Sequence, residues 1–156
     1  VQDVQVGTAS SPADPRRPIV GVTISTYLFD VRMPFPVDIE SDNVGGPSAG
    51  FMFALGILDA VTDGDLTRGY YVAGTGTIAQ DGSVGAVGGA AEKALAAEDD
   101  GAQVFLVPRD DYEEARRWVR RIQLVPIDRF GDAIQALCAL SPLPTGASPE
   151  PPTPCG

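Results

Sequence analysis

The sequence predicts an α/β fold with a mixed sheet, four helices and a β-hairpin. Helix-forming segments with one apolar face alternate with short runs rich in Val, Ile and Thr over most of the chain. The pair Asp81-Gly82 between two such runs is a strong signal for a two-residue hairpin, so part of the sheet must be antiparallel. The chain has 156 residues and is 44% apolar, which suffices for one domain with a proper core.

The position of each expected helix and strand follows from the spacing of apolar residues along the chain. Strands are expected at residues 19–29, 37–40, 70–80, 83–87, 103–107 and 122–127, where β-branched and aromatic residues gather. Helices are expected at residues 48–61, 90–100, 110–120 and 130–140. Pro47 suits the first turn of the first helix, and Asp63-Gly64-Asp65 ends it. Residues 1–6 alternate weakly and are compatible with a strand stub.

Prolines mark the expected domain boundaries. Three prolines in residues 10–18 break regular structure, so residues 1–18 are interpreted as the stub of a preceding domain with its linker. Residues 19–140 form the expected main domain. Residues 141–156 contain six prolines and are expected to be a disordered tail.

The composition excludes several classes of function. The net charge is −10, so the surface repels phosphate backbones and no nucleic-acid partner is expected. The chain has no histidine and no C-x-x-C pair, so we expect no metal site, and we expect no cofactor. The longest apolar run, residues 51–58, is too short to cross a bilayer.

The two cysteines, Cys138 and Cys155, leave two interpretations open. They can form a disulfide that closes a short loop, which implies an oxidising compartment. Alternatively, one is buried in the last helix and the other is a free thiol in the tail.

The stretch Gly74-Thr75-Gly76-Thr77-Ile78-Ala79 matches the G-x-G-x-x-A fingerprint of dinucleotide-binding proteins. That fingerprint requires a helix to begin at the glycines, so that the pyrophosphate meets its N-terminus. Here a strand is expected to continue and turn at Asp81-Gly82, so nucleotide binding is not predicted.

Ser48 is the first candidate for a catalytic residue. It lies in Gly45-Gly46-Pro47-Ser48-Ala49-Gly50, at the start of a predicted helix. A serine there sits at the positive end of the helix dipole, beside free backbone N–H groups, and the glycines let a substrate carbonyl approach. These features suit a nucleophile with an oxyanion hole, but they also suit an ordinary helix start.

Lys93 is the candidate base for that serine. A serine nucleophile needs a positioned base, the chain has no histidine, and Lys93 is its only lysine. Its neighbours on the predicted helix are small and uncharged: Gly89, Ala90, Ala96 and Ala97. Burial on such a face would favour the neutral amine, although a lysine covering an alanine-rich face is the ordinary alternative. The hydroxyl of Thr75 is a candidate for orienting that amine.

The residues around these candidates resemble the proteolytic domain of Lon-type serine peptidases. Gly46-Pro47-Ser48-Ala49-Gly50 matches the nucleophile motif of that family. Its lysine block is matched by Thr75-Gly76-Thr77-Ile78, Gly82-Ser83-Val84, Val87-Gly88-Gly89, Glu92-Lys93, Ala96-Ala97 and Gly101. The resemblance covers about residues 19–140 and consists of two separate motifs in the right order.

The resemblance implies the Lon proteolytic-domain fold and a Ser–Lys dyad of Ser48 and Lys93, with Thr75 supporting the amine. Backbone N–H groups of Gly46 and Ser48 would stabilise the oxyanion. The implied activity is a serine endopeptidase that cleaves extended or unfolded polypeptides. Family members typically assemble as hexamers, so a homo-oligomer is expected.

Within the family, Gly45-Gly46 and Gly64-Asp65-Leu66-Thr67 look most like the PDZ-linked, membrane-anchored bacterial branch, which has no ATPase. This implies ATP-independent proteolysis and an extracytoplasmic site. A PDZ domain and a membrane anchor would then lie outside this chain, which is expected to be soluble by itself. The alternative is a non-catalytic peptide-binding module that keeps the same fold.

Overall fold

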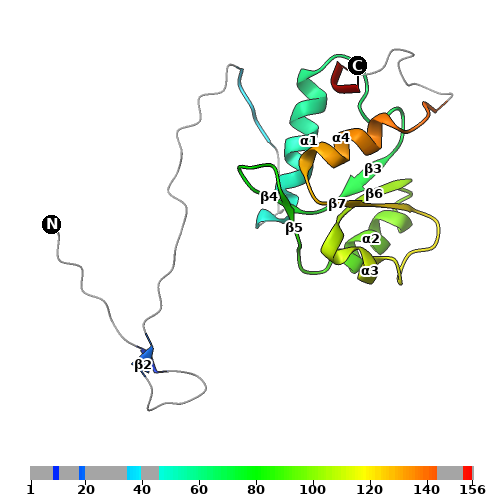
Figure 1. Ribbon diagram of the computed structural model, residues 1–156. Coiled ribbons are helices and arrows are strands. Elements are labelled where there is room, and N and C mark those ends of the chain that lie inside the picture. The colour runs from blue at the N-terminus through cyan, green and yellow to red at the C-terminus, as the bar shows by residue number, and fades with distance from the viewer. Residues whose placement is uncertain (1–8, 11–17, 20–34, 40–45, 144–152, 156) are drawn as a thin grey trace. The chain divides into compact units, whose positions relative to one another are not determined.

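A computed structural model describes residues 9–10, 18–19, 35–39, 46–143 and 153–155 (Figure 1). The chain divides into two compact units, residues 1–36 and 37–156. In the first unit, β1 (Ala9–Ser10) pairs antiparallel with β2 (Pro18–Ile19). The strand stub expected at residues 1–6, and residues 20–29 of the next expected strand, lie outside the described residues. The predicted domain boundaries remain predictions.

A three-stranded parallel sheet lies at the centre of the second unit. Its strands are β3 (Val72–Gly74), β6 (Val104–Pro108) and β7 (Gln123–Ile127), in the order β3-β6-β7. Val72 lies opposite Val104, which lies opposite Gln123 on the other side. All five residues of β6 are buried, as expected for a central parallel strand covered on both faces.

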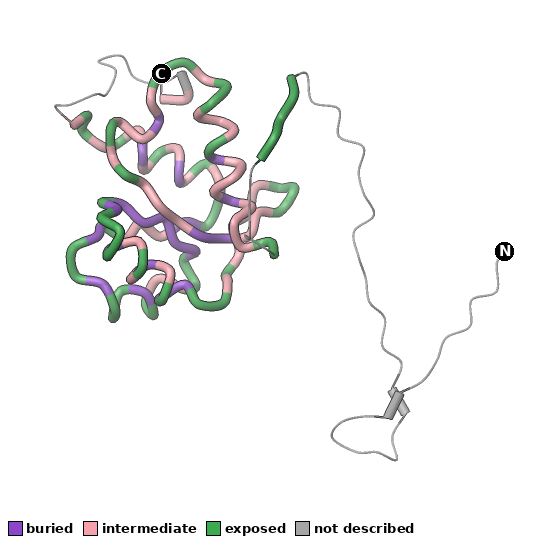
Figure 2. Tube along the Cα trace, turned by 180° about the vertical axis from the view of Figure 1, so that it is seen from behind, coloured by how far each residue is buried: buried purple, intermediate pink, exposed green. Residues whose placement is uncertain are grey.

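Helices cover both faces of this sheet (Figures 1 and 2). On one face, α1 (Gly50–Val61) and α4 (Phe130–Cys138) pack on Val104 and Leu106 of β6. On the other, α2 (Ala90–Asp99) and α3 (Arg109–Ala115) pack on Phe105 and Val107. Successive side chains of β6 thus serve opposite core clusters, because a strand points its side chains to alternate faces.

A separate two-stranded sheet follows β3. Its strands β4 (Thr77–Ile78) and β5 (Val84–Gly85) are antiparallel, which confirms the predicted hairpin. The two-residue turn predicted at Asp81-Gly82 is wrong, because residues 79–83 connect the strands and the Gly82 N–H donates to the Ala79 carbonyl. The single strand predicted at residues 70–80 is wrong in one respect, because it breaks at Thr75 and Gly76. Gly76 has φ +155°, and a Cβ there would lie 2.8 Å from Cγ1 of Val84. Packing against Val84 therefore requires a glycine at position 76.

The mixed α/β class with four helices is confirmed, and most bounds agree with the prediction. The first predicted helix divides into a 3₁₀ helix η1 (Pro47–Ala49) followed by α1. Helix α3 ends at Ala115, before the predicted residue 120, because Arg117 and Trp118 donate to carbonyls three residues back and tighten the chain. Residues 37–39 form no strand, contrary to prediction.

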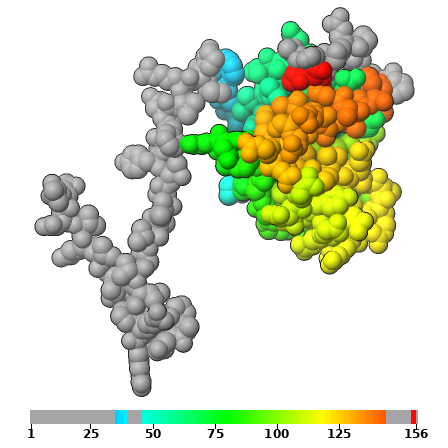
Figure 3. Space-filling model, viewed as in Figure 1, coloured from blue at the N-terminus to red at the C-terminus, as the bar shows by residue number. Residues whose placement is uncertain are grey.

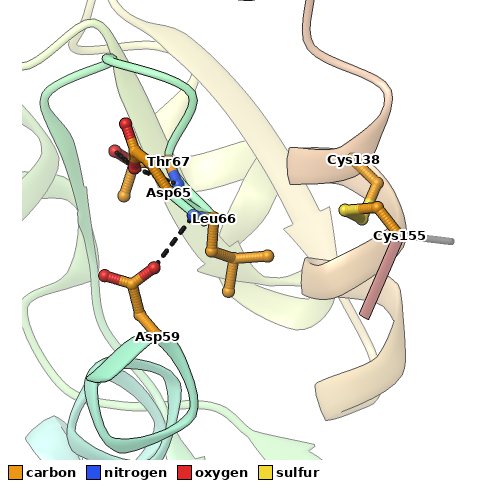
Figure 4. Close-up of a disulfide and its surroundings, with 6 residues drawn as sticks. All are labelled: Asp59, Asp65, Leu66, Thr67, Cys138 and Cys155. Carbon is orange, nitrogen blue, oxygen red and sulfur yellow. Dashed lines mark hydrogen bonds between the residues drawn. A yellow bond between two sulfur atoms is a disulfide. The ribbon is translucent and has the colours of Figure 1, made fainter. Parts of the chain in front are cut away.

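A disulfide joins Cys138, the last residue of α4, to Cys155 in the 3₁₀ helix η2 (Thr153–Cys155). The two Cα atoms are 5.4 Å apart, and the cysteines are separated by 17 positions in sequence. Figure 3 shows η2 lying against α4, and Figure 4 shows the bonded sulfur atoms. The structure therefore supports the first interpretation of the two cysteines, a disulfide. The disorder predicted for the tail remains a prediction.

A cavity of about 180 Å³ lies beside α1 on the disulfide-bearing side of the sheet. The residues around it are mostly apolar: Met52, Leu55, Gly56, Asp59, Leu66, Thr67, Val72 and Leu137. Asp59, one of these residues, accepts a hydrogen bond from the Leu66 N–H at 2.9 Å (Figure 4).

Candidate active site

Ser48 lies where the sequence predicts it, at the entrance to α1. Gly46 precedes η1 with φ +83°, a conformation that favours glycine, and Pro47 begins the turn. Ser48 is half-buried, while Gly46 is exposed. The oxyanion role of the backbone N–H groups of Gly46 and Ser48 remains a prediction.

Lys93 reaches Ser48 from the helix on the other face of the sheet. It is half-buried in the first turn of α2, and its Nζ donates to the Ser48 Oγ at 3.3 Å. The two residues are 45 positions apart. The structure thus brings together the predicted nucleophile and the predicted base.

Thr75 joins the same group of atoms. It occupies the break between β3 and β4, and only 3% of its surface is exposed. Its Oγ1 donates to the Ser48 carbonyl oxygen at 3.0 Å, and Lys93 Nζ donates to that Oγ1 at 3.5 Å. A threonine hydroxyl carries one proton, which the Ser48 carbonyl already receives, so only its lone pairs face the lysine.

The break at Thr75 and Gly76 is fixed from both sides. The Thr75 N–H donates to the Leu106 carbonyl at 3.0 Å, and the Gly76 N–H donates to the Ser48 carbonyl at 2.9 Å. The Phe51 N–H donates in turn to the Gly76 carbonyl at 3.2 Å. These bonds tie the end of β3 to β6 and to the start of α1. The hairpin that follows the glycines also excludes the dinucleotide interpretation, because that fingerprint requires a helix to begin there.

Close packing beside this break requires Gly74. A Cβ at this position would lie 2.6 Å from the Met52 sulfur and 2.8 Å from the Leu106 carbonyl oxygen. Any larger residue would push β3 away from α1 or β6, and Thr75 would move with it.

Glu98 holds the helix that carries Lys93, and sequence reasoning missed this role. Its side chain is buried, and its Oε2 accepts N–H bonds from Arg120, Arg121 and Ile122. These three bonds lower the pKa of Glu98 to about 2 from an ordinary value of 4.5. The carboxylate thereby fastens α2 to the segment that enters β7. No local pattern signals it, because its partners lie 22 to 24 residues away.

The loop that leads into α2 has its own anchor. The Val87 N–H donates to Asp111 Oδ2 of α3 at 2.9 Å. Gly89, the residue before α2, has φ +71°, which glycine adopts without strain. The start of α2 is therefore fixed by α3, one turn before Lys93.

Within the described residues, no group of His, Cys, Asp and Glu side chains could hold a metal ion. No helix in that part of the chain is both long and apolar enough to cross a membrane.

The model of one protein family, the Lon protease (S16) C-terminal proteolytic domain, matches residues 16–138. The chain belongs to this family. The match includes all three residues of the site, Ser48, Thr75 and Lys93.

Curated relatives agree with this assignment. Lon protease 2 of Bacillus subtilis (strain 168) is 28% identical over 114 residues, 73% of this chain. The Lon protease of Phenylobacterium zucineum is 32% identical over 137 residues, 83% of this chain. The Lon protease of Roseiflexus castenholzii is 33% identical over 117 residues, 71% of this chain. The matched parts span only 20%, 16% and 14% of these relatives, so the chain corresponds to a small part of each.

Proposed function

We propose that this Lon proteolytic domain is a serine endopeptidase with a Ser–Lys dyad, acting without ATP on extended or unfolded polypeptides. The observation that carries the proposal is the 3.3 Å contact between Lys93 Nζ and Ser48 Oγ. This distance allows proton transfer between the amine and the hydroxyl after a small approach, as is common before substrate binds.

In the proposed mechanism, neutral Lys93 accepts the Ser48 proton while Oγ attacks the scissile carbonyl carbon. Backbone N–H groups of Gly46 and Ser48 stabilise the negative oxygen that forms. Lys93 then protonates the leaving amine, and an acyl-enzyme remains on Ser48 until water hydrolyses it. Thr75 accepts one amine hydrogen, which turns the amine lone pair toward the Ser48 hydroxyl.

ATP-independence and cellular setting are parts of the same proposal. Gly45-Gly46 and Gly64-Asp65-Leu66-Thr67 support the ATPase-free branch, in which a PDZ domain and a membrane anchor accompany the protease. The disulfide supports an extracytoplasmic site, because such bonds persist in oxidising compartments. A hexamer is proposed from the family resemblance.

The proposal predicts that Ser48→Ala and Lys93→Arg each lower kcat/KM on an unfolded protein substrate by at least about 10³-fold. Lys93→Arg keeps the positive charge but cannot supply a neutral base. Ser141→Ala, an exposed serine outside the site, is the matched control and should retain full activity. The assay is run with and without ATP, and equal rates are expected.

Full activity in either site variant would rule out the dyad. The rival hypothesis, a non-catalytic peptide-binding module, predicts peptide binding without cleavage in the unmodified protein. Cleavage that requires ATP would refute the ATP-independent part alone.

A further inference from the structure

The disulfide lies at one end of α4, and the candidate active site is linked to the other end. Cys138 closes the C-terminal end of the helix, and neither cysteine is fully buried. Cys138, Leu140 and Cys155 pack against the core cluster that contains Phe51 and Leu137. The bond therefore holds η2 and the end of α4 against that core.

The N-terminal end of α4 is bonded to the hairpin. The Phe130 N–H donates to the Gly82 carbonyl at 2.8 Å, and the Val84 N–H donates to the Asp128 carbonyl at 2.8 Å. The Arg129 guanidinium donates to the Asp81 carbonyl as well. The turn of the hairpin is thus attached to α4 by both backbone and side-chain bonds.

Helix α4 also touches the helix that carries the nucleophile. The rings of Phe130 and Phe51 meet edge to face, with their centroids 6.3 Å apart. Phe51 lies three residues after Ser48, and its N–H binds the Gly76 carbonyl. Direct contacts therefore connect the disulfide, through α4, to the hairpin and to Phe51, which is bonded to Gly76.

We propose that the Cys138–Cys155 disulfide is a redox-sensitive clamp on the active-site hairpin. With the bond formed, α4 holds the hairpin, and with it Thr75 and Gly76, against Ser48. Reduction frees η2, loosens α4 and lowers peptidase activity. The activity part of this inference rests on the proposed function, whereas the conformational part does not.

The reaction requires a dithiol reductant. One thiolate of the reductant attacks a cysteine sulfur, forms a mixed disulfide and releases the other cysteine as a thiolate. The second thiol of the reductant then displaces the first cysteine. Cys138 and Cys155 gain two electrons and two protons, and the reductant becomes a cyclic disulfide.

Hydrogen–deuterium exchange tests the conformational part on the whole chain, with the bond intact and after treatment with dithiothreitol. Amides of Val84 and Phe130 should exchange at least about 10-fold faster in the reduced protein, since their bonds join the hairpin to the start of α4. The amide of Gly76, which is bonded to Ser48 and lies just before the hairpin, should follow them. Amides of β6 should not change. Cys155→Ser should match the reduced protein and should not respond to dithiothreitol.

Two outcomes would overturn the clamp. Faster exchange confined to the last turn of α4 and η2 would show that the hairpin does not depend on the bond. Faster exchange throughout β6 would show that the bond maintains the entire fold and has no selective effect on the hairpin.

Peptidase assays on the same samples test the activity part. Reduction and Cys155→Ser should each lower kcat several-fold on an unfolded protein substrate, with a smaller change in KM, because the reacting groups and not the substrate contacts are disturbed. Equal kcat in oxidised and reduced protein would refute the regulation. A protein inactive in every state would refute the proposed peptidase function, while the exchange data would still decide the clamp.

Discussion

Ser48 is held through its own backbone. Its carbonyl oxygen accepts hydrogen bonds from Thr75 Oγ1 at 3.0 Å and from the Gly76 N–H at 2.9 Å. Because these bonds come from the break between β3 and β4, a displacement of that break moves the hydroxyl that faces Lys93. Thr75 therefore positions two groups, the amine through its lone pairs and the serine through its proton.

This double role predicts different outcomes for two substitutions of Thr75. Thr75→Val keeps the shape but removes the hydroxyl, and should lower kcat/KM on the order of 10²-fold, the effect of a misplaced reacting group. Thr75→Ser keeps the hydroxyl and should retain most of the activity. Peptidase kinetics on an unfolded substrate measure both.

Thr62→Val is the matched control, because Thr62 also donates its hydroxyl to a backbone carbonyl, that of Leu58 at 2.8 Å, at the far end of α1. It should leave kcat unchanged. If Thr75→Val were as active as this control, the hydroxyl would have no part in the reaction.

At the scale of elements, α1 contains a glycine, Gly56, at a position where the surrounding structure does not require one. A Cβ on Gly56 would meet no atom within 4 Å, since the residue borders the cavity beside α1. Glycine in the middle of a helix costs about 0.5–1 kcal/mol relative to alanine, because it loses more backbone freedom on folding.

Gly56→Ala should therefore raise the free energy of unfolding by about 0.5–1 kcal/mol in a denaturant titration. Gly101→Ala is the matched control, because a Cβ there also has open space, but φ is +88°. That substitution should destabilise the protein. Equal effects of the two substitutions would show that backbone conformation does not decide the outcome.

The elements also show how far sequence reasoning reaches. Apolar periodicity predicted α2 and α4 to begin at Ala90 and Phe130, as they do. These patterns did not predict the break at Thr75 and Gly76, because the break is held by hydrogen bonds to Leu106 and Ser48, which are distant in sequence. The hairpin accordingly forms its own sheet, separate from β3, β6 and β7.

The candidate site was likewise predicted only in part. Elimination of histidine and the family resemblance singled out Ser48, Lys93 and Thr75, and the structure brings these three together. Their supports, Glu98 and Asp111, escaped prediction because each carboxylate binds backbone N–H groups that are distant in sequence. The chemical type of a residue is visible in a sequence, whereas its backbone partner is not.

At the scale of the molecule, Glu98 makes the free energy of unfolding depend on pH in the acid range. Its pKa is about 2 in the folded protein and near 4.5 when unfolded, so folding favours the ionised form. This contribution is fully present above about pH 5 and is lost as the pH falls from 4.5 toward 2. Protonation would also release α2, and hence Lys93, from the segment before β7.

Thermal melts between pH 7 and pH 2.5 test this expectation. Glu98→Gln should lower Tm at pH 7, because a neutral amide oxygen accepts these N–H bonds more weakly than a charged carboxylate does. The difference in Tm between the variant and the unmodified protein should shrink as the pH falls below about 4.5. A difference that stays constant over the whole range would contradict the role assigned to Glu98.

The lysine that contacts Ser48 is the only lysine in these 156 residues, and the other ten basic side chains are arginines. Reagents that acylate or reductively methylate amines therefore find one side chain to modify, besides the α-amino group. A second label on the intact protein, beyond the one on the α-amino group, therefore reports on the candidate base. The composition itself therefore makes labelling of the candidate base selective among the side chains.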